Sequence, residues 1–131
     1  EVPRFILNDI IKKLSLHKIK ISTANILFLG ATFKENTSDI RNSKALELAS
    51  QMNEIVENVY LYDPYIDKRT LNTKLCIMDE LPKDKKFNIL VLAVKHKEFL
   101  KLDPMSFIEK EGFVYDVKGM FKPISGMIYS L

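Results

Sequence analysis

The sequence contains few of the features that mark secreted, membrane or nucleic-acid-binding proteins. It has a single cysteine, Cys76, which excludes an internal disulfide framework and fits a reducing compartment. It contains no run of about 18 apolar residues, so no membrane span is expected. The net charge is only +3 and the lysines are scattered, which disfavours nucleic-acid binding. These absences favour a cytoplasmic protein that binds neither membranes nor nucleic acid.

The amino terminus lacks two further features. The segment Glu1-Val2-Pro3-Arg4 contains no methionine and does not resemble a signal peptide, which favours a fragment of a longer protein. The 131 residues are 47% hydrophobic and 28% charged, which fits one domain with a buried core. The sequence shows no internal repeat and no low-complexity segment.

The most informative stretch runs from residue 26 to residue 44. A continuous apolar run, typical of a strand covered on both faces, ends at Gly30. A polar loop follows, with Lys34 near its start and Arg41 near its end. Because this glycine stands alone, the loop is not the G-x-G-x-x-G fingerprint of a dinucleotide site. The pattern predicts a strand, a loop and a helix, with two cations where an anion such as phosphate can bind.

Polar residues also follow the other predicted strands. These strands are expected at three apolar runs: 59–62, 88–94 and 113–117. Asp63, His96 and Lys118 come directly after or close behind them. Since parallel strands present their carboxyl ends at one edge, these residues are expected to meet Lys34 there. A solvated rim of unrelated charges is the alternative.

The roles of four single residues have to be weighed separately. Asp63 can hold ribose hydroxyls or cap the following turn, and we favour the cap. His96 can act as a general base, bind phosphate or orient a loop, and we favour the loop; no ligand cluster nearby predicts a metal site. We interpret Cys76 as a buried, inert thiol and His17 as a solvated helix cap without a function.

Three helices are predicted from caps and apolar spacing. They cover residues 3–18, a segment capped by Asn42 or Ser43, and residues 103–112. The third begins with Asp103 as cap and Pro104, and Gly112 is expected to end it.

Five segments resemble motifs of one enzyme family. Residues 30–37 and 39–43 resemble the G-x-x-F-K-x-[ND]-[TC]-x-D-x-R-[NE]-S signature of the UDP-glucose/GDP-mannose dehydrogenases, the nucleotide-sugar 6-dehydrogenases. Residues 62–65, 93–99 and 115–119 resemble further motifs of the same family. The similarity is greatest to the branch that acts on UDP-N-acetylhexosamines, and the signature belongs to the C-terminal, UDP-binding domain.

The resemblance implies an α/β fold: a Rossmann-like three-layer domain with a mostly parallel sheet, preceded by the end of a connecting helix. Residues 1–22 would end that helix, and residues 23–131 would bind the UDP-sugar. By transfer of the motif, Phe33, Lys34 and Lys118 would contact the nucleotide sugar. Arg41 would reach the NAD cofactor, held mainly by an N-terminal domain absent from this chain. The alternatives are packing for Phe33 and, for Arg41, a salt bridge to Asp39 or to the acidic residues of the following helix.

The resemblance also implies an activity. The full enzyme would oxidise the C6 alcohol of a UDP-N-acetylhexosamine to a uronate with NAD, as a cytoplasmic dimer in capsule or surface-polysaccharide synthesis. The family's catalytic-cysteine motif is absent, so Cys76 does not inherit that role and no catalytic residue is assigned here. The chain alone is expected to be inactive. A UDP-glucose 6-dehydrogenase is the alternative within the family. Outside it, the alternatives are a receiver-type signalling module and a dimerisation domain without ligand.

Overall fold

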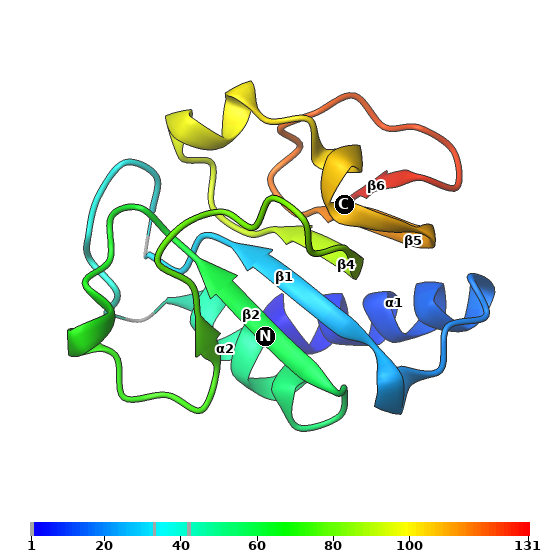
Figure 1. The fold of residues 1–131 in the computed structure, drawn as a ribbon, viewed down its shortest axis with the longest axis horizontal. Helices are drawn as coiled ribbons and strands as arrows, with labels where there is room; N and C mark the ends of the chain where they lie inside the picture. Colours follow the sequence, from blue (N-terminus) through cyan, green and yellow to red (C-terminus); the bar gives the residue numbers. More distant parts are fainter. Residues whose placement is uncertain (1, 33, 42) are drawn as a thin grey trace.

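A computed structural model of the chain describes residues 2–32, 34–41 and 43–131. The described residues form a six-stranded sheet flanked by helices (Figure 1). The elements in chain order are α1 (Val2–Leu16), η1 (Ile21–Thr23), β1 (Asn25–Leu29), α2 (Lys44–Asn53), β2 (Asn58–Tyr62), η2 (Lys68–Thr70), β3 (Cys76–Ile77), β4 (Phe87–Leu92), η3 (Lys97–Lys101), η4 (Pro104–Phe107), β5 (Ile108–Asp116) and β6 (Ile128–Ser130), where η marks a 3₁₀ helix. None of these helices is long and apolar enough to cross a membrane.

The strand order is that of a doubly wound nucleotide-binding fold. The strands lie in the order β3-β2-β1-β4-β5-β6, and all five pairings between them are parallel. The chain reverses its direction across the sheet between β1 and β4, which creates a switch point at the carboxyl ends of these two central strands. The predicted Rossmann-like α/β fold with a mostly parallel sheet is therefore confirmed.

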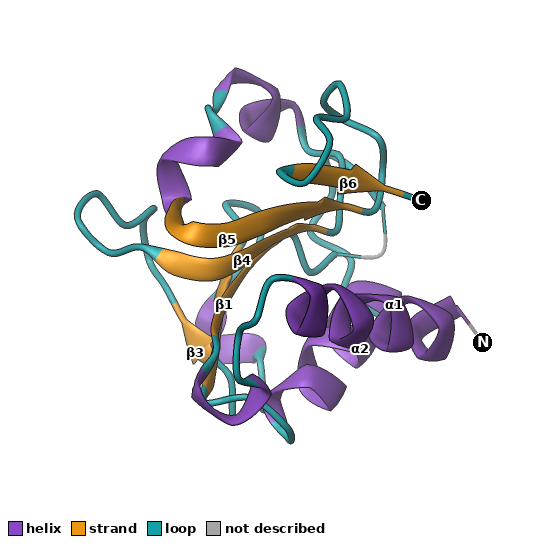
Figure 2. Cartoon of the chain, turned by 90° about the vertical axis from the view of Figure 1, so that its right-hand side faces the viewer, coloured by secondary structure: helices purple, strands orange, loops and turns teal. Residues whose placement is uncertain are grey.

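Two apolar layers explain the continuous hydrophobic runs in the central strands. On one face, α1 and α2 pack over a cluster that includes Phe28 of β1 (Figure 2). On the other face, η3, η4 and their loops cover a cluster that includes Leu27 and Leu29. Because successive side chains of a strand point to opposite faces, a strand covered on both sides has to be apolar throughout.

Helix α1 confirms the helix predicted near the amino terminus and packs on the sheet of its own domain. Ile6, Ile10 and Leu14 recur at helical spacing and are at most 2% exposed. The Tyr115 hydroxyl donates a 2.6 Å hydrogen bond to Oδ2 of Asp9, which ties α1 to β5. Burial and this hydrogen bond raise the pKa of Tyr115 above its usual value.

His17 is not the solvated cap that we expected. Its Nε2 lies 2.8 Å from the Tyr129 hydroxyl, and its Nδ1 lies 3.0 Å from the Glu111 carbonyl oxygen. The imidazole ring also packs against Phe113 at 4.5 Å between centroids. His17 therefore anchors the end of α1 to β5 and β6. These partners are far away in the sequence, so no local pattern revealed them.

The helix predicted over residues 103–112 is wrong in length. Asp103 does cap a helix, but η4 ends at Phe107 and β5 begins at the next residue. The three charged residues after Ile108 offer no apolar side chain to continue a buried helical face, and pairing with β4 takes over. Gly112 lies within β5 at the register shift, where an added Cβ would stand 2.5 Å from the Asn88 carbonyl oxygen.

Cys76 is exposed, which contradicts the buried thiol that we expected. It lies in the short edge strand β3, and Leu75, the residue just before this strand, enters the core instead. Alternation along a strand makes such neighbours face opposite ways, and the sequence alone did not show which of the two would be buried.

Candidate functional site

A groove opens at the carboxyl edge of the sheet, beside the switch point between β1 and β4. Its volume is about 260 Å³. It is lined by Thr32, Lys34, Glu35, Lys44, Ala45, Ala93, Val94 and Lys118. Lys34 and Lys118 therefore meet at one edge, as the sequence predicted. Three lysines against one glutamate make the groove suitable for an anionic ligand.

A smaller apolar cavity adjoins the groove. Its volume is about 160 Å³, and it shares Lys44, Ala45, Ala93 and Lys118 with the groove. Its other lining residues are Ile6, Leu48 and Val117, from α1, α2 and the end of β5. The combined site is cationic at one end and apolar at the other, which suits a ligand with an anionic part and a less polar part.

Lys44 is the groove residue that the sequence analysis missed. It is the first residue of α2, directly after the cap Ser43, whose Oγ accepts a 3.0 Å hydrogen bond from the Leu46 amide. The Ser43 hydroxyl donates to the Ala31 carbonyl oxygen at 2.6 Å, which fixes the helix start against the strand end. The Lys44 ammonium lies 3.7 Å from Glu47 and its side chain is 63% exposed, so it remains accessible. The sequence signal that could have identified Lys44 was its position directly after a predicted helix cap.

Lys118 is placed by the turn that follows β5. The Val117 amide donates to the Leu92 carbonyl oxygen at 3.1 Å, which continues the pairing with β4. The buried Asp116 carboxylate accepts a 2.8 Å hydrogen bond from the Phe121 amide through Oδ2. Its other oxygen has no hydrogen-bond partner among the described residues.

Gly30 brings the loop after β1 against the loop after β4. Its φ angle is +102°, and an added Cβ would stand 2.6 Å from the Val94 Cβ. The Gly30 amide donates to the Tyr62 carbonyl oxygen at 3.0 Å. Glycine is required here for the approach of two loops, rather than for the approach of a ligand.

Asp63 and His96 form a buried pair beneath the same loop. His96 Nε2 lies 2.8 Å from Asp63 Oδ2, and both side chains are at most 1% exposed. The other carboxylate oxygen, Oδ1, accepts a 2.8 Å hydrogen bond from the Tyr65 amide, which confirms the predicted cap. Burial and the hydrogen bond to Glu98 raise the pKa of Tyr65, whose ring covers His96 at 4.5 Å.

Arg41 does not line the groove. Its guanidinium makes two hydrogen bonds to the Asp39 carboxylate, at 3.1 and 3.0 Å, and its side chain is 85% exposed. The Arg41 side chain and backbone amide, both bonded to this carboxylate, lower the pKa of Asp39 to about 2. The salt bridge that we weighed as the alternative is thus present. Phe33, the remaining predicted contact, lies outside the described residues.

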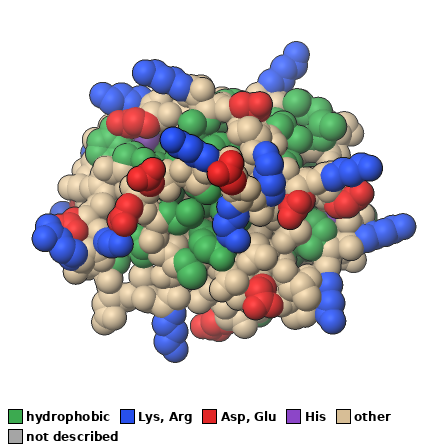
Figure 3. Space-filling model, viewed as in Figure 1, with side chains coloured by type: hydrophobic (Ala, Val, Ile, Leu, Met, Phe, Trp, Pro, Cys, Tyr) green, Lys and Arg blue, Asp and Glu red, His purple; other side chains and the backbone are tan. Residues whose placement is uncertain are grey.

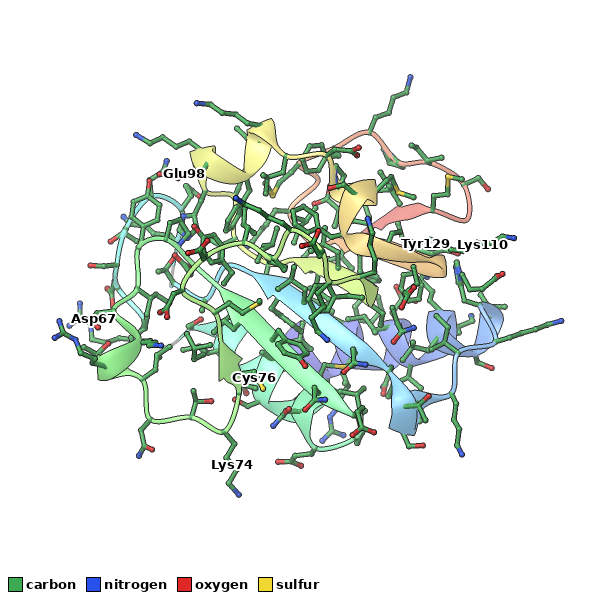
Figure 4. The ribbon with its side chains drawn as sticks, in the orientation of Figure 1. Asp67, Lys74, Cys76, Glu98, Lys110 and Tyr129 are labelled. Atoms are coloured by element: carbon green, nitrogen blue, oxygen red, sulfur yellow. The ribbon has the colours of Figure 1, made fainter. Side chains whose placement is uncertain are left out.

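Charged side chains outside the groove are mixed rather than clustered by sign on the face shown in Figure 3. Basic and acidic side chains alternate over this face, which agrees with the scattered lysines of the sequence. Figure 4 shows Lys110 at the end of the molecule opposite Glu98, and Lys110 does not line the groove.

Comparisons with known proteins agree with this geometry. Protein CapL of Staphylococcus aureus is 30% identical over 123 residues, which cover 89% of this chain and 28% of CapL. The UDP-N-acetyl-D-glucosamine 6-dehydrogenase of Salmonella typhi is 25% identical over 118 residues, covering 87% of this chain and 28% of that protein. The chain thus spans less than a third of the length of these relatives.

A solved structure has the same fold. The UDP-D-ManNAc dehydrogenase of Pyrococcus horikoshii superposes on 98% of this chain and 30% of its own, with a TM-score of 0.81 and 27% identity. Residues 27–123 match the UDP binding domain of the UDP-glucose/GDP-mannose dehydrogenases, and they include every described lysine of the groove. The chain therefore belongs to the UDP-glucose/GDP-mannose dehydrogenase family and corresponds to its UDP binding domain.

Proposed function

We propose that this chain binds the UDP part of a UDP-N-acetylhexosamine in an NAD-dependent 6-dehydrogenase that oxidises the C6 alcohol to a uronate. The observation that carries this proposal is the groove at the switch point, where lysines from three separate segments meet. The names of the relatives, which include UDP-N-acetylglucosamine and UDP-N-acetylmannosamine dehydrogenases, support the sugar class. A UDP-glucose dehydrogenase is the second candidate, supported by a solved structure of 23% identity that shows the shared fold.

The diphosphate occupies the cationic end of the site. Lys34, Lys44 and Lys118 approach it from the loop after β1, the start of α2 and the turn after β5. Each charge-assisted hydrogen bond is worth about 1.5–3 kcal/mol where the ligand excludes water, and less where the lysine stays solvated. The adjoining apolar cavity takes a less polar part of the ligand. We also infer that Phe33 contacts the nucleotide sugar.

The oxidation itself takes place outside this chain. The relatives are more than three times longer than the segment matched here, and we assign the main NAD site and the catalytic cysteine to the remainder of such a protein. Residues 1–22, with α1, would then end the helix that connects the two parts. We further infer a cytoplasmic homodimer that serves capsule or other surface-polysaccharide synthesis.

A calorimetric titration tests the binding proposal. UDP should bind the natural protein that contains this chain, and uridine, which lacks the diphosphate, should bind at least about tenfold more weakly, since the lysines then have no anion. The 131-residue chain is titrated in parallel, to show whether the groove suffices alone. Equal affinity for UDP and uridine, or no heat with UDP in the natural protein, would contradict the proposal.

Arg41 is expected to act on the cofactor rather than on UDP. Its exposed guanidinium can leave Asp39 at little cost, because exposed ion pairs contribute little. In the natural protein, Arg41→Ala should raise the KM for NAD about tenfold and leave the Kd for UDP within about twofold. Asp39→Ala is the control, since it frees the guanidinium without removing it. An unchanged KM for NAD in Arg41→Ala would mean that Arg41 forms the salt bridge to Asp39 and does not contact the cofactor.

A further inference from the structure

His96 is a fully buried histidine at the point where the loops after β1, β2 and β4 meet. It follows β4 and belongs to neither of the cavities described above. It bonds to residues 33 and 60 positions away in the sequence, Asp63 and Asn36. A buried polar side chain that bonds to two other loops is expected to hold those loops in place.

The hydrogen bonds of His96 identify its tautomer. The Asn36 backbone amide can only donate, and it lies 2.9 Å from Nδ1, so Nδ1 carries no proton. The proton is then on Nε2 and points to the Asp63 carboxylate at 2.8 Å. Thr32 Oγ1, which is 3.2 Å from Nε2, uses its own hydrogen to bond the Lys34 carbonyl oxygen. His96 is therefore a neutral imidazole that accepts on one side and donates on the other.

This network holds the backbone at Lys34 and just after it. The Thr32 hydroxyl donates to the Lys34 carbonyl oxygen at 2.8 Å. Two residues later, Asn36 has a left-handed φ of +58°, and its amide donates to His96 Nδ1. The Asn36 side-chain oxygen accepts from the Lys97 amide at 3.0 Å, which adds a second link to the loop after β4.

Tyr65 closes the network from outside. Its ring lies over His96 at 4.5 Å, and its hydroxyl donates to both carboxylate oxygens of Glu98 at 3.0 and 2.9 Å. His96 thus has no exposed surface of its own. It cannot touch a ligand in the groove, and any effect on binding has to pass through the loop.

We propose that His96 is a positioning residue for the ligand. As the neutral Nε2–H tautomer, it holds the Lys34 loop in the conformation that binds the diphosphate, so that the loop is ordered before the ligand arrives. An ordered loop loses less conformational entropy on binding, which raises the affinity. This proposal rests on the proposed binding of UDP.

Two substitutions test the contacts of the two ring nitrogens of His96 separately. In His96→Asn, the amide oxygen can take the place of Nδ1 and accept from Asn36, although the side chain no longer reaches Asp63. In His96→Gln, the longer amide can reach Asp63, but the acceptor for Asn36 is lost. If the loop contact matters, His96→Gln should weaken UDP binding about tenfold, and His96→Asn should stay within about threefold of wild type.

His17, the other histidine of this chain, provides the matched control. His17→Gln removes a ring that also has two hydrogen bonds, but at the far end of the sheet, towards Tyr129 in Figure 4. It should lower thermal stability and leave UDP affinity unchanged. All affinities are measured by calorimetry on the natural protein, below the melting temperature of each variant.

Nitrogen-15 NMR of the wild-type protein gives a measurement that no folding defect can obscure. The ring signals that are lost in the His96 variants and retained in His17→Gln belong to His96. At neutral pH, His96 should show an Nε2–H proton and an unprotonated Nδ1.

The outcomes are distinct. A His96 ring that carries a proton on Nδ1, alone or together with one on Nε2, would overturn the proposal. Where wild type binds UDP, an equal loss of UDP affinity in both His96 variants, or a loss in neither, would also overturn it. A wild-type protein that does not bind UDP at all would overturn the proposed function and this inference together. The first set of results leaves UDP binding by wild type intact, so the two failures can be told apart.

Discussion

Gly30→Ala is expected to lower the free energy of unfolding by about 3 kcal/mol or more, a large part of the total stability of a typical domain. The added Cβ would lie 2.6 Å from the Val94 Cβ and 2.9 Å from the Val94 amide nitrogen. The backbone cannot relax freely, because a φ of +102° is itself strained for any residue with a Cβ. The loss is measured by urea denaturation followed by circular dichroism.

Gly126→Ala separates the clash from the strain. Gly126 also has a positive φ, of +74°, but an added Cβ would meet no atom within 4 Å. It should therefore lose only the backbone contribution, about 1–2 kcal/mol. If Gly30→Ala lost no more stability than Gly126→Ala, the close approach of the two loops in the structure would be wrong.

The double variant Lys34→Ala/Lys118→Ala is expected to raise the Kd for UDP about 100-fold, or roughly tenfold for each lysine. Tenfold corresponds to about 1.4 kcal/mol, near the lower limit for hydrogen bonds to charged groups, which is appropriate because both lysines are exposed before the ligand binds. Calorimetry on the natural protein measures the change. Lys44→Ala should give a smaller loss of UDP affinity, because the nearby Glu47 carboxylate already neutralises part of the Lys44 charge.

A charge-matched variant distinguishes contact from general attraction. Lys74→Ala/Lys110→Ala removes the same charge from exposed positions outside the groove, labelled in Figure 4. Long-range effects of exposed charges are largely screened at physiological ionic strength, so this variant should bind UDP within about twofold of wild type. Equal weakening in the two double variants would mean that the lysines of the groove attract UDP without contacting it.

Much of the fold could be predicted from short stretches of sequence. The apolar run before Gly30 identified a strand covered on both faces, and the two candidate caps, Asn42 and Ser43, identified the start of α2, where Ser43 is the cap in the structure. These signals are local, because strand burial and helix capping depend on residues a few positions apart. The same local reasoning failed after Asp103, since both a 3₁₀ turn and an α-helix can begin with an aspartate followed by proline, and pairing with β4 decided between them.

The candidate site could be predicted in part. Lys34 and Lys118 were expected at one edge because each follows a strand, and parallel strands end together. Lys44 was missed because it follows a cap rather than a strand, and the structure alone shows that α2 starts beside the turn after β5. The roles proposed for Lys34, Lys118, Arg41 and Phe33 come from the family motif, whereas the role proposed for Lys44 comes from its place in the groove.

The sequence by itself therefore determined the parts of this protein: the buried strands, the turn at Gly30, the cap of α2 and the motif that identifies the family. The tertiary structure alone decided how those parts meet. Strands β1 and β4 are more than 50 residues apart in the chain, yet they lie side by side and place His96 under the Lys34 loop. Local conformation is encoded within a few residues, whereas strand order and loop contacts depend on packing the whole chain around one core.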